Sequence, residues 1–84
     1  MLENMNEKDF YKWFGKEFQG LREKRGLKQK DVADIAGIAS TELSRFENTG
    51  KKISAYKILR LLKAIESSME EILGETEKKT YSHD

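Results

Sequence analysis

The stretch at residues 29–46, QKDVADIAGIASTELSRF, decides the fold of this chain. Its apolar residues recur at helical spacing on both sides of a single glycine: Val32, Ala33, Ile35, Ala36, Ile38, Leu43 and Phe46. Gly37 can adopt the positive φ that ends a helix and turns the chain. Leu43 and Phe46 lie three residues apart and share a face of the helix that follows. A helix, a short glycine-containing turn and a second helix make a helix-turn-helix.

One amphipathic helix is predicted before this unit. It begins near Asn6, whose side chain can cap it, and runs to about Arg25. Its apolar residues recur at spacings of four, four and three and form one stripe: Phe10, Phe14, Phe18 and Leu21. Tyr11 lies at the border of the stripe and Trp13 outside it. These two residues either cover the end of the domain or form a contact in a dimer.

The helix-turn-helix is expected to comprise helices at Lys28–Ala36 and Ser40–Asn48, followed by a short loop. Ser54 can cap a fourth helix, and Ser68 with Glu71 forms a capping box for a short fifth helix. The apolar residues expected on the packed side are Ile58, Leu59, Leu62 and Ile65 in the fourth helix, and Met69, Ile72 and Leu73 in the fifth. The chain is therefore predicted to be all-α.

Composition confines the chain to one small domain. Its 84 residues are 37% hydrophobic, enough for a modest core, and contain no proline, which favours helices. The absence of cysteine excludes disulfides, thiolate nucleophiles and zinc knuckles, and it agrees with a cytoplasmic location. No apolar run approaches the ~20 residues of a membrane span. We expect a domain at residues 6–74, an N-terminal segment at 1–5 and a polar tail at 75–84.

The charged residues are unevenly distributed. The net charge is only +1, but residues 15–60 contain eleven Lys and Arg against six Asp and Glu, a net charge of +5. Residues 61–84 carry −3 and residues 1–14 carry −1. Such asymmetry either indicates a face that binds a polyanion or arises by chance in a chain with 37% charged residues.

Seven residues stand at the signature positions of a known family: Gln29, Ala33, Gly37, Ile38, Leu43, Ser44 and Glu47. From Gly15 to Leu73 the chain resembles the lambda-repressor-like (Cro/C1, or XRE) DNA-binding domains. The words SRFE at residues 44–47 and Ile53-Ser54 are similar to the N-terminal domain of the Rgg/MutR regulators of Gram-positive bacteria. The resemblance implies a five-helix bundle that binds double-stranded DNA without a cofactor.

The third helix is expected to meet base edges in the major groove, as the second helix of a helix-turn-helix does. The residues expected to do so are Ser40, Thr41, Glu42 and, one turn on, Arg45. Arg45 can donate two hydrogen bonds to a guanine, and Thr41 offers a hydroxyl and a methyl group to adenine–thymine pairs. Glu42 either accepts a hydrogen bond from a cytosine or serves as a first-turn acid favoured by the helix dipole.

Donors around this helix are expected to contact phosphates: Lys28, Gln29, Asn48, Lys51 and Lys52. Gln29 stands in the first turn of the second helix, where its amide and the backbone N–H groups can hold one phosphate together. The resemblance implies the same role for this glutamine. Lys51 and Lys52 fit a solvated loop equally well.

The resemblance also implies that Arg22, late in the first helix, pairs with Glu47 at the end of the third. Glu47 is then a structural residue, and the pair holds the recognition helix against the first helix. The resemblance further implies close packing at Gly15 and Gly20, where the family takes small residues.

The chain departs from the family pattern in three places. Ala39 stands where a serine or threonine caps the recognition helix, so that Ser40 is expected to take over the cap. Lys28 replaces the usual cap of the second helix. Thr49-Gly50 stands where the family has a single glycine, so the loop after the third helix is predicted to be one residue longer.

These observations favour a sequence-specific regulator that acts as a homodimer on a two-fold operator. Rgg/MutR proteins also carry a C-terminal domain that binds a regulatory peptide, so this sequence corresponds either to their DNA-binding part or to a small regulator that acts alone. The alternative is a protein-interaction module such as an antitoxin or anti-repressor. An enzyme is disfavoured, because the single histidine, His83, lies in the tail and no catalytic or metal-ligating motif is visible.

Overall fold

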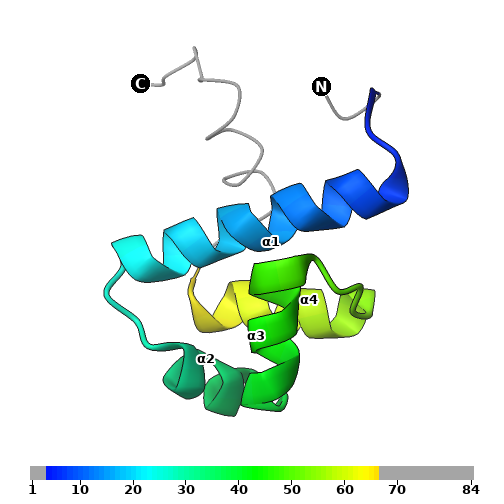
Figure 1. Cartoon of the computed structure of the whole chain (residues 1–84). Coiled ribbons are helices and arrows are strands. Elements are labelled where there is room, and N and C mark those ends of the chain that lie inside the picture. The colour runs from blue at the N-terminus through cyan, green and yellow to red at the C-terminus, as the bar shows by residue number, and fades with distance from the viewer. Residues whose placement is uncertain (1–3, 67–84) are drawn as a thin grey trace, which may run out of the picture.

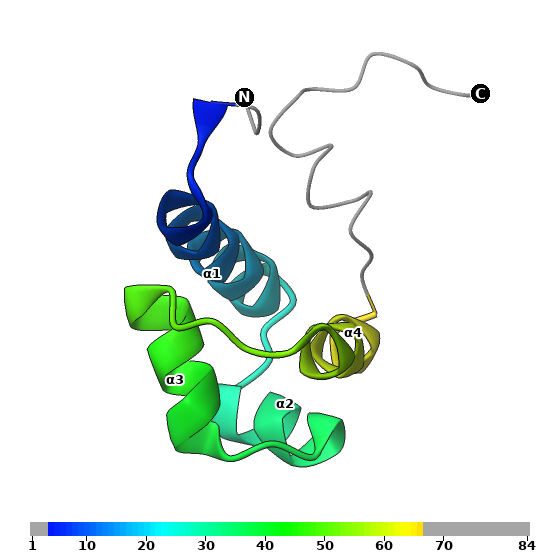
Figure 2. The ribbon, with the colours of Figure 1, turned by 90° about the vertical axis from the view of Figure 1, so that its right-hand side faces the viewer.

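The computed structural model describes residues 4–66, which form four α-helices (Figures 1 and 2). These helices are α1 (Glu7–Lys24), α2 (Gln29–Ala36), α3 (Ser40–Thr49) and α4 (Ala55–Ala64). The all-α prediction is confirmed, and α2, α3 and the turn between them form the predicted helix-turn-helix. The fifth helix predicted near residues 68–74 and the tail at 75–84 lie outside the described residues. Within residues 4–66, no helix is both long enough and apolar enough to cross a membrane.

The four helices pack around a single core. Helix α1 lies against α3, and α2 packs against both α3 and α4. Figure 1 shows α3 rising from α2, so that the C-terminal end of α3 meets α1. The buried apolar residues come from every helix and from the residues on either side of α4: Phe14, Phe18, Leu21, Val32, Ala33, Ala36, Leu43, Phe46, Ile53, Leu61, Leu62 and Ile65. This core fixes the two helices of the helix-turn-helix relative to each other.

Side-chain caps start two of the helices, and the other two start without one. The side chains of Asn6 and Ser54 accept hydrogen bonds from the backbone N–H three residues on, at 2.8 and 3.2 Å, as predicted. Lys28 and Ala39 precede α2 and α3 without making a side-chain capping bond. Ser40 is the first residue of α3, so the prediction that it takes over the cap is wrong.

Left-handed glycines end the two helices of the helix-turn-helix. Gly37 ends α2 with φ of 76°, and Gly50 ends α3 with φ of 75°. Thr49 is the last residue of α3, and its hydroxyl donates to the Arg45 carbonyl at 2.8 Å. The additional residue predicted to lengthen the loop is therefore accommodated in the helix.

Helix α1 approaches the end of α3 closely because two glycines have no side chain. A Cβ on Gly15 would collide with the backbone carbonyl of Phe46, and one on Gly50 would lie 2.6 Å from Cα of Lys12. Gly20, by contrast, has open space around it. The predicted close packing is thus present at Gly15, whereas the prediction for Gly20 is wrong.

The predicted packed face of α4 is confirmed at Ile58, Leu62 and Ile65 and wrong at Leu59. The side chain of Leu59 is exposed, whereas that of Leu61 is buried. The apolar residues of this helix fall on more than one side, so their spacing alone does not select a face. Contact with α2 decides which side is covered.

Aromatic residues cover the N-terminal half of α1. Phe10 lies within 6 Å, between ring centroids, of Tyr11, Trp13 and Phe14, and Phe14 contacts Phe46 edge to face. Tyr11 and Trp13 are partly buried against the core. Of the two interpretations that the sequence leaves open, this packing favours a cover for the end of the domain.

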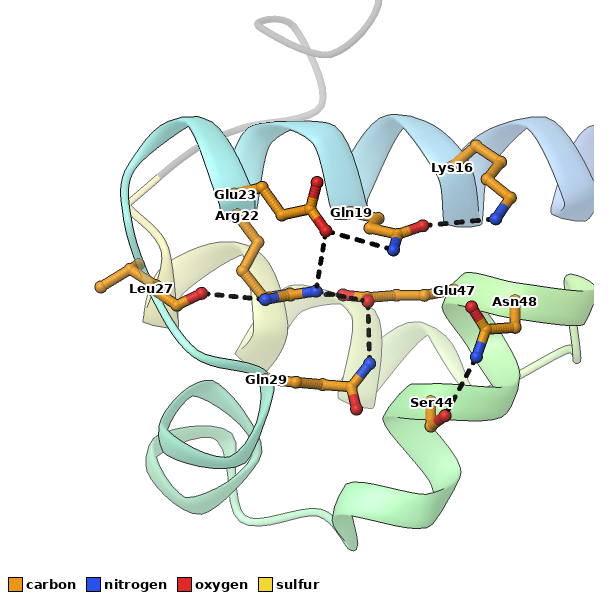
Figure 3. Close-up of polar contacts among 9 residues, drawn as sticks. All are labelled: Lys16, Gln19, Arg22, Glu23, Leu27, Gln29, Ser44, Glu47 and Asn48. Atoms are coloured by element: carbon orange, nitrogen blue, oxygen red, sulfur yellow. Dashed lines mark hydrogen bonds and ion pairs between the residues drawn. The ribbon is translucent and has the colours of Figure 1, made fainter.

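The ion pair expected between Arg22 and Glu47 is present inside the protein (Figure 3). Glu47 is completely buried, and its two carboxylate oxygens accept hydrogen bonds from Nε and Nη2 of Arg22 at 2.8 and 2.9 Å. Arg22 also donates from Nη1 to the carbonyl of Leu27 at 2.9 Å. The hydrogen bond to Glu47 raises the pKa of Arg22 above its ordinary value, so this guanidinium stays charged.

We predict opposite effects for two glycine substitutions in α1. Gly15→Ala should lower the free energy of unfolding by about 1–3 kcal/mol, because the new methyl group meets the rigid backbone at Phe46. Gly20→Ala, in the same helix but in open space, should raise it by about 0.5–1 kcal/mol. Urea unfolding of both variants measures the difference. Equal effects at the two positions would contradict the close approach of α1 and α3.

We also predict that Glu47→Ala lowers the free energy of unfolding by about 3–5 kcal/mol, because Arg22 is left buried without its carboxylate partner. The matched control is Glu23→Ala, which removes an exposed carboxylate 3.7 Å from the same guanidinium. That change should alter stability by less than about 1 kcal/mol. Thermal unfolding of both variants tests the pair, and an unchanged melting temperature for Glu47→Ala would refute its structural role.

Candidate nucleic-acid interface

Helix α3 has one buried face and one open face. Leu43, Phe46 and Glu47 are buried against the other helices. Thr41 and Arg45 are separated by one helical turn, and both are exposed. Ser40, at the start of the helix, is exposed as well. Three of the four residues predicted to contact bases therefore lie on the surface of α3, within its first six residues.

The fourth residue predicted to contact bases, Glu42, is held by α4. Its carboxylate oxygens lie 2.9 and 3.1 Å from Nζ of Lys57. The Glu42 side chain is 23% exposed and that of Lys57 is 40% exposed. The Glu42 side chain thus points from α3 toward α4, and Lys57 neutralises its charge.

Gln29 links the start of α2 to the buried ion pair (Figure 3). Its side-chain amide donates from Nε2 to Oε1 of Glu47 at 2.9 Å. This bond fixes the orientation of the Gln29 amide. The amide has a second N–H and a carbonyl oxygen in addition to the N–H that makes this bond. The glutamine predicted to hold a phosphate is therefore also part of the network that connects α1, α2 and α3.

The other predicted phosphate contacts surround α3 on the surface. Lys28, Asn48, Lys51 and Lys52 are all exposed. Asn48 donates from its amide to the Ser44 hydroxyl at 3.1 Å. Lys52 lies 2.8 Å from the carboxylate of Glu7 in the first turn of α1, and this hydrogen bond raises the pKa of Lys52. The predicted cations are thus exposed at the start of α2 and after α3, although Lys52 is paired.

Three of the cations predicted to contact DNA have no anionic partner among residues 4–66: Lys28, Arg45 and Lys51. In contrast, the two acidic residues of α3 are both neutralised, Glu42 by Lys57 and Glu47 by Arg22. Arg45 and Lys51 thus leave positive charge on α3 and directly after it, and Lys28 adds another at the start of α2. Such charge attracts a polyanion.

Sequence reasoning missed two residues of α4 that hold the helix-turn-helix. Lys57 pairs with Glu42, and Arg60 donates from Nε to the carbonyl of Ala36 at 2.8 Å, at the C-terminus of α2. Arg60 also lies over the ring of Tyr56, 5.8 Å from its centroid. No local signal identifies these residues, because their partners are 15 and 24 residues away in the sequence.

The polar groups exposed near α3 are of kinds suited to binding. Within residues 4–66 no three His, Cys, Asp or Glu side chains gather in a way that could hold a metal ion. The polar groups that face outward near α3 are hydroxyl, amide, ammonium and guanidinium groups, which are the donors that contact base edges and phosphates.

Comparison with known proteins agrees with this geometry. A solved structure with a similar fold is the restriction-modification controller protein C.AhdI from Aeromonas hydrophila, which is 25% identical with a TM-score of 0.71. The match covers 76% of this chain and 97% of that chain. The comparison with curated proteins finds no match.

A family model described as Helix-turn-helix matches residues 19–72, which is more than half of the chain. The match includes α2, α3 and α4 together with the end of α1. The family consists of non-enzymatic DNA-binding domains. The chain therefore belongs to the helix-turn-helix family, of the Cro/C1 type.

Proposed function

We propose that this protein binds double-stranded DNA at specific sequences by placing α3 in the major groove, and that it regulates transcription. The observation that carries this proposal is the open face of α3, where Thr41 and Arg45 are exposed while the opposite face is locked in the core. A rigid helix with exposed donors near its N-terminus is the element that enters the groove in helix-turn-helix proteins. The likeness to a controller protein supports the regulatory role.

Arg45 is the residue that we expect to dominate base recognition. It has no anionic partner in residues 4–66, so its guanidinium is free to donate to O6 and N7 of a guanine. Thr41, one turn earlier on the same face, and Ser40 offer hydroxyl groups to the neighbouring base pairs. Glu42 is paired with Lys57 at 2.9 Å, so we leave it out of the residues that we propose to read bases.

The phosphate contacts that we propose lie on either side of α3. Gln29 and Lys28 are at the start of α2, where backbone N–H groups have no partner within the helix. Asn48, Lys51 and Lys52 are at the end of α3 and in the loop after it. Lys52 reaches a phosphate by exchanging its surface ion pair with Glu7, which is worth little in water.

We further propose that the active species is a homodimer in the cytoplasm. One recognition helix covers only a few base pairs, and a symmetric pair bound to a two-fold operator doubles the contacts. The words SRFE and Ile53-Ser54 also support kinship with Rgg/MutR regulators. That kinship would add a regulatory peptide or a C-terminal domain as a partner.

A second candidate function is a protein-interaction module of the antitoxin or anti-repressor kind. The observation that favours it is the exposure of three large apolar side chains: Ile35, Tyr56 and Leu59. Salt distinguishes the two functions, because binding through phosphate contacts weakens steeply as salt rises, whereas an apolar protein interface does not.

We predict that wild-type protein selects a defined motif from a pool of random duplexes. Arg45→Ala should weaken binding to that motif by about 5- to 150-fold, because one bidentate contact to a base is lost. Arg45→Lys keeps the charge but not the two parallel donors. It should therefore retain binding to unselected duplexes and lose the preference at one base pair.

The measurement is repeated selection followed by titration of each variant with the selected duplex at several salt concentrations. A motif with two-fold symmetry would support the homodimer. If wild type enriches no motif, or if its affinity does not fall with salt, the proposal of a sequence-specific regulator fails.

A further inference from the structure

The contact between Glu42 and Lys57 joins the first turns of two different helices. Glu42 follows Thr41 directly and precedes Arg45 by three residues on α3, and Lys57 is in the first turn of α4. Nζ of Lys57 contacts both carboxylate oxygens, at 2.9 and 3.1 Å. A negative charge thus stands beside the residues proposed to read bases, together with one cation that neutralises it.

We propose that Lys57 is a positioning residue for DNA binding, which holds the Glu42 carboxylate against α4 and away from Arg45 and the DNA. This inference rests on the proposed function, since it assigns a role at the same surface. Lys57 acts through Glu42 and does not itself need to touch DNA.

Two physical effects make an unpaired Glu42 harmful. A free carboxylate beside the groove repels the phosphates, which lowers the affinity for every duplex. In addition, residues 42 and 45 are three apart on a helix, so their side chains are neighbours. A released Glu42 would compete for the Arg45 guanidinium and divert it from a guanine.

The exposure of the pair argues against a role in stability alone. With side chains 23% and 40% exposed, the pair is only partly buried, and such a pair contributes less to the free energy of unfolding than a fully buried one. The buried pair of Arg22 and Glu47, with side chains 8% and 0% exposed, is the contrasting case. Removing Lys57 should therefore affect DNA binding far more than folding.

The test is a double-mutant cycle on the full chain, with Lys57→Met, Glu42→Gln and the two changes combined. The control is Lys63→Met, which removes an exposed lysine from the last turn of the same helix. Lys57→Arg is the conservative variant. Affinity is measured by titrating a mixed-sequence duplex of 20 base pairs at several salt concentrations, and each variant is also unfolded by heat and used for motif selection.

We expect Lys57→Met to weaken binding about tenfold, and Glu42→Gln in the same chain to restore it to within about twofold of wild type. Glu42→Gln alone should bind as tightly as wild type or more tightly, with the same selected motif, because the negative charge that Lys57 restrains is then absent. Lys57→Arg and Lys63→Met should bind within about twofold of wild type. The melting temperatures of these variants should stay close together.

Other outcomes overturn the inference while leaving the proposed function intact. If Lys57→Met costs the same affinity with and without Glu42, Lys57 contacts phosphate directly. If Glu42→Gln changes the selected motif, Glu42 reads a base. If Lys57→Met lowers the melting temperature in proportion to its loss of binding, the pair is structural. Absence of salt-dependent binding by wild type would instead overturn the proposed function and the inference together.

Discussion

The structure depends on one buried carboxylate. Glu47 has no exposed surface, and its charge is compensated by two hydrogen bonds from Arg22 and one from Gln29. These three residues belong to α3, α1 and α2, so a single ionised group connects three helices. Because a buried charge is tolerated only when its partners are held in good geometry, the network admits few other arrangements of these helices. It therefore fixes the direction in which α3 presents its open face.

The two ends of α3 are held in different ways, one by close backbone packing at glycines and the other by an ion pair. At its C-terminal end, Gly15 and Gly50 let α1 approach backbone to backbone, which leaves no room for sliding. At its N-terminal end the contact is polar and partly wet, through Lys57 of α4. The C-terminal end is thus packed backbone to backbone, and the end held by side chains is the one nearer to the residues proposed to read bases. This division leaves the residues proposed to read bases outside the core.

The sequence predicted what local chemistry decides. Asn6 and Ser54 are caps because they combine a short polar side chain with a following apolar pattern, and Gly37 turns the chain because the αL conformation suits glycine. It did not predict what packing decides. Leu59 lies in a helix with apolar residues on several sides. The side of α4 that packs against α2 is another one, so Leu59 is left exposed. The partner of Glu42 is fifteen residues away, beyond the reach of any helical spacing.

The same distinction bears on the proposed site. Thr41 and Arg45 were inferred from the geometry of a helix whose other face is buried, and the exposure of both follows directly from that periodicity. Glu42 belongs to neither face, because its carboxylate is paired with Lys57 in the first turn of α4. A residue in such a position points to the groove or to the neighbouring helix according to the partner that it finds there. The direction in which Glu42 points is therefore set by α4 and not by α3 itself.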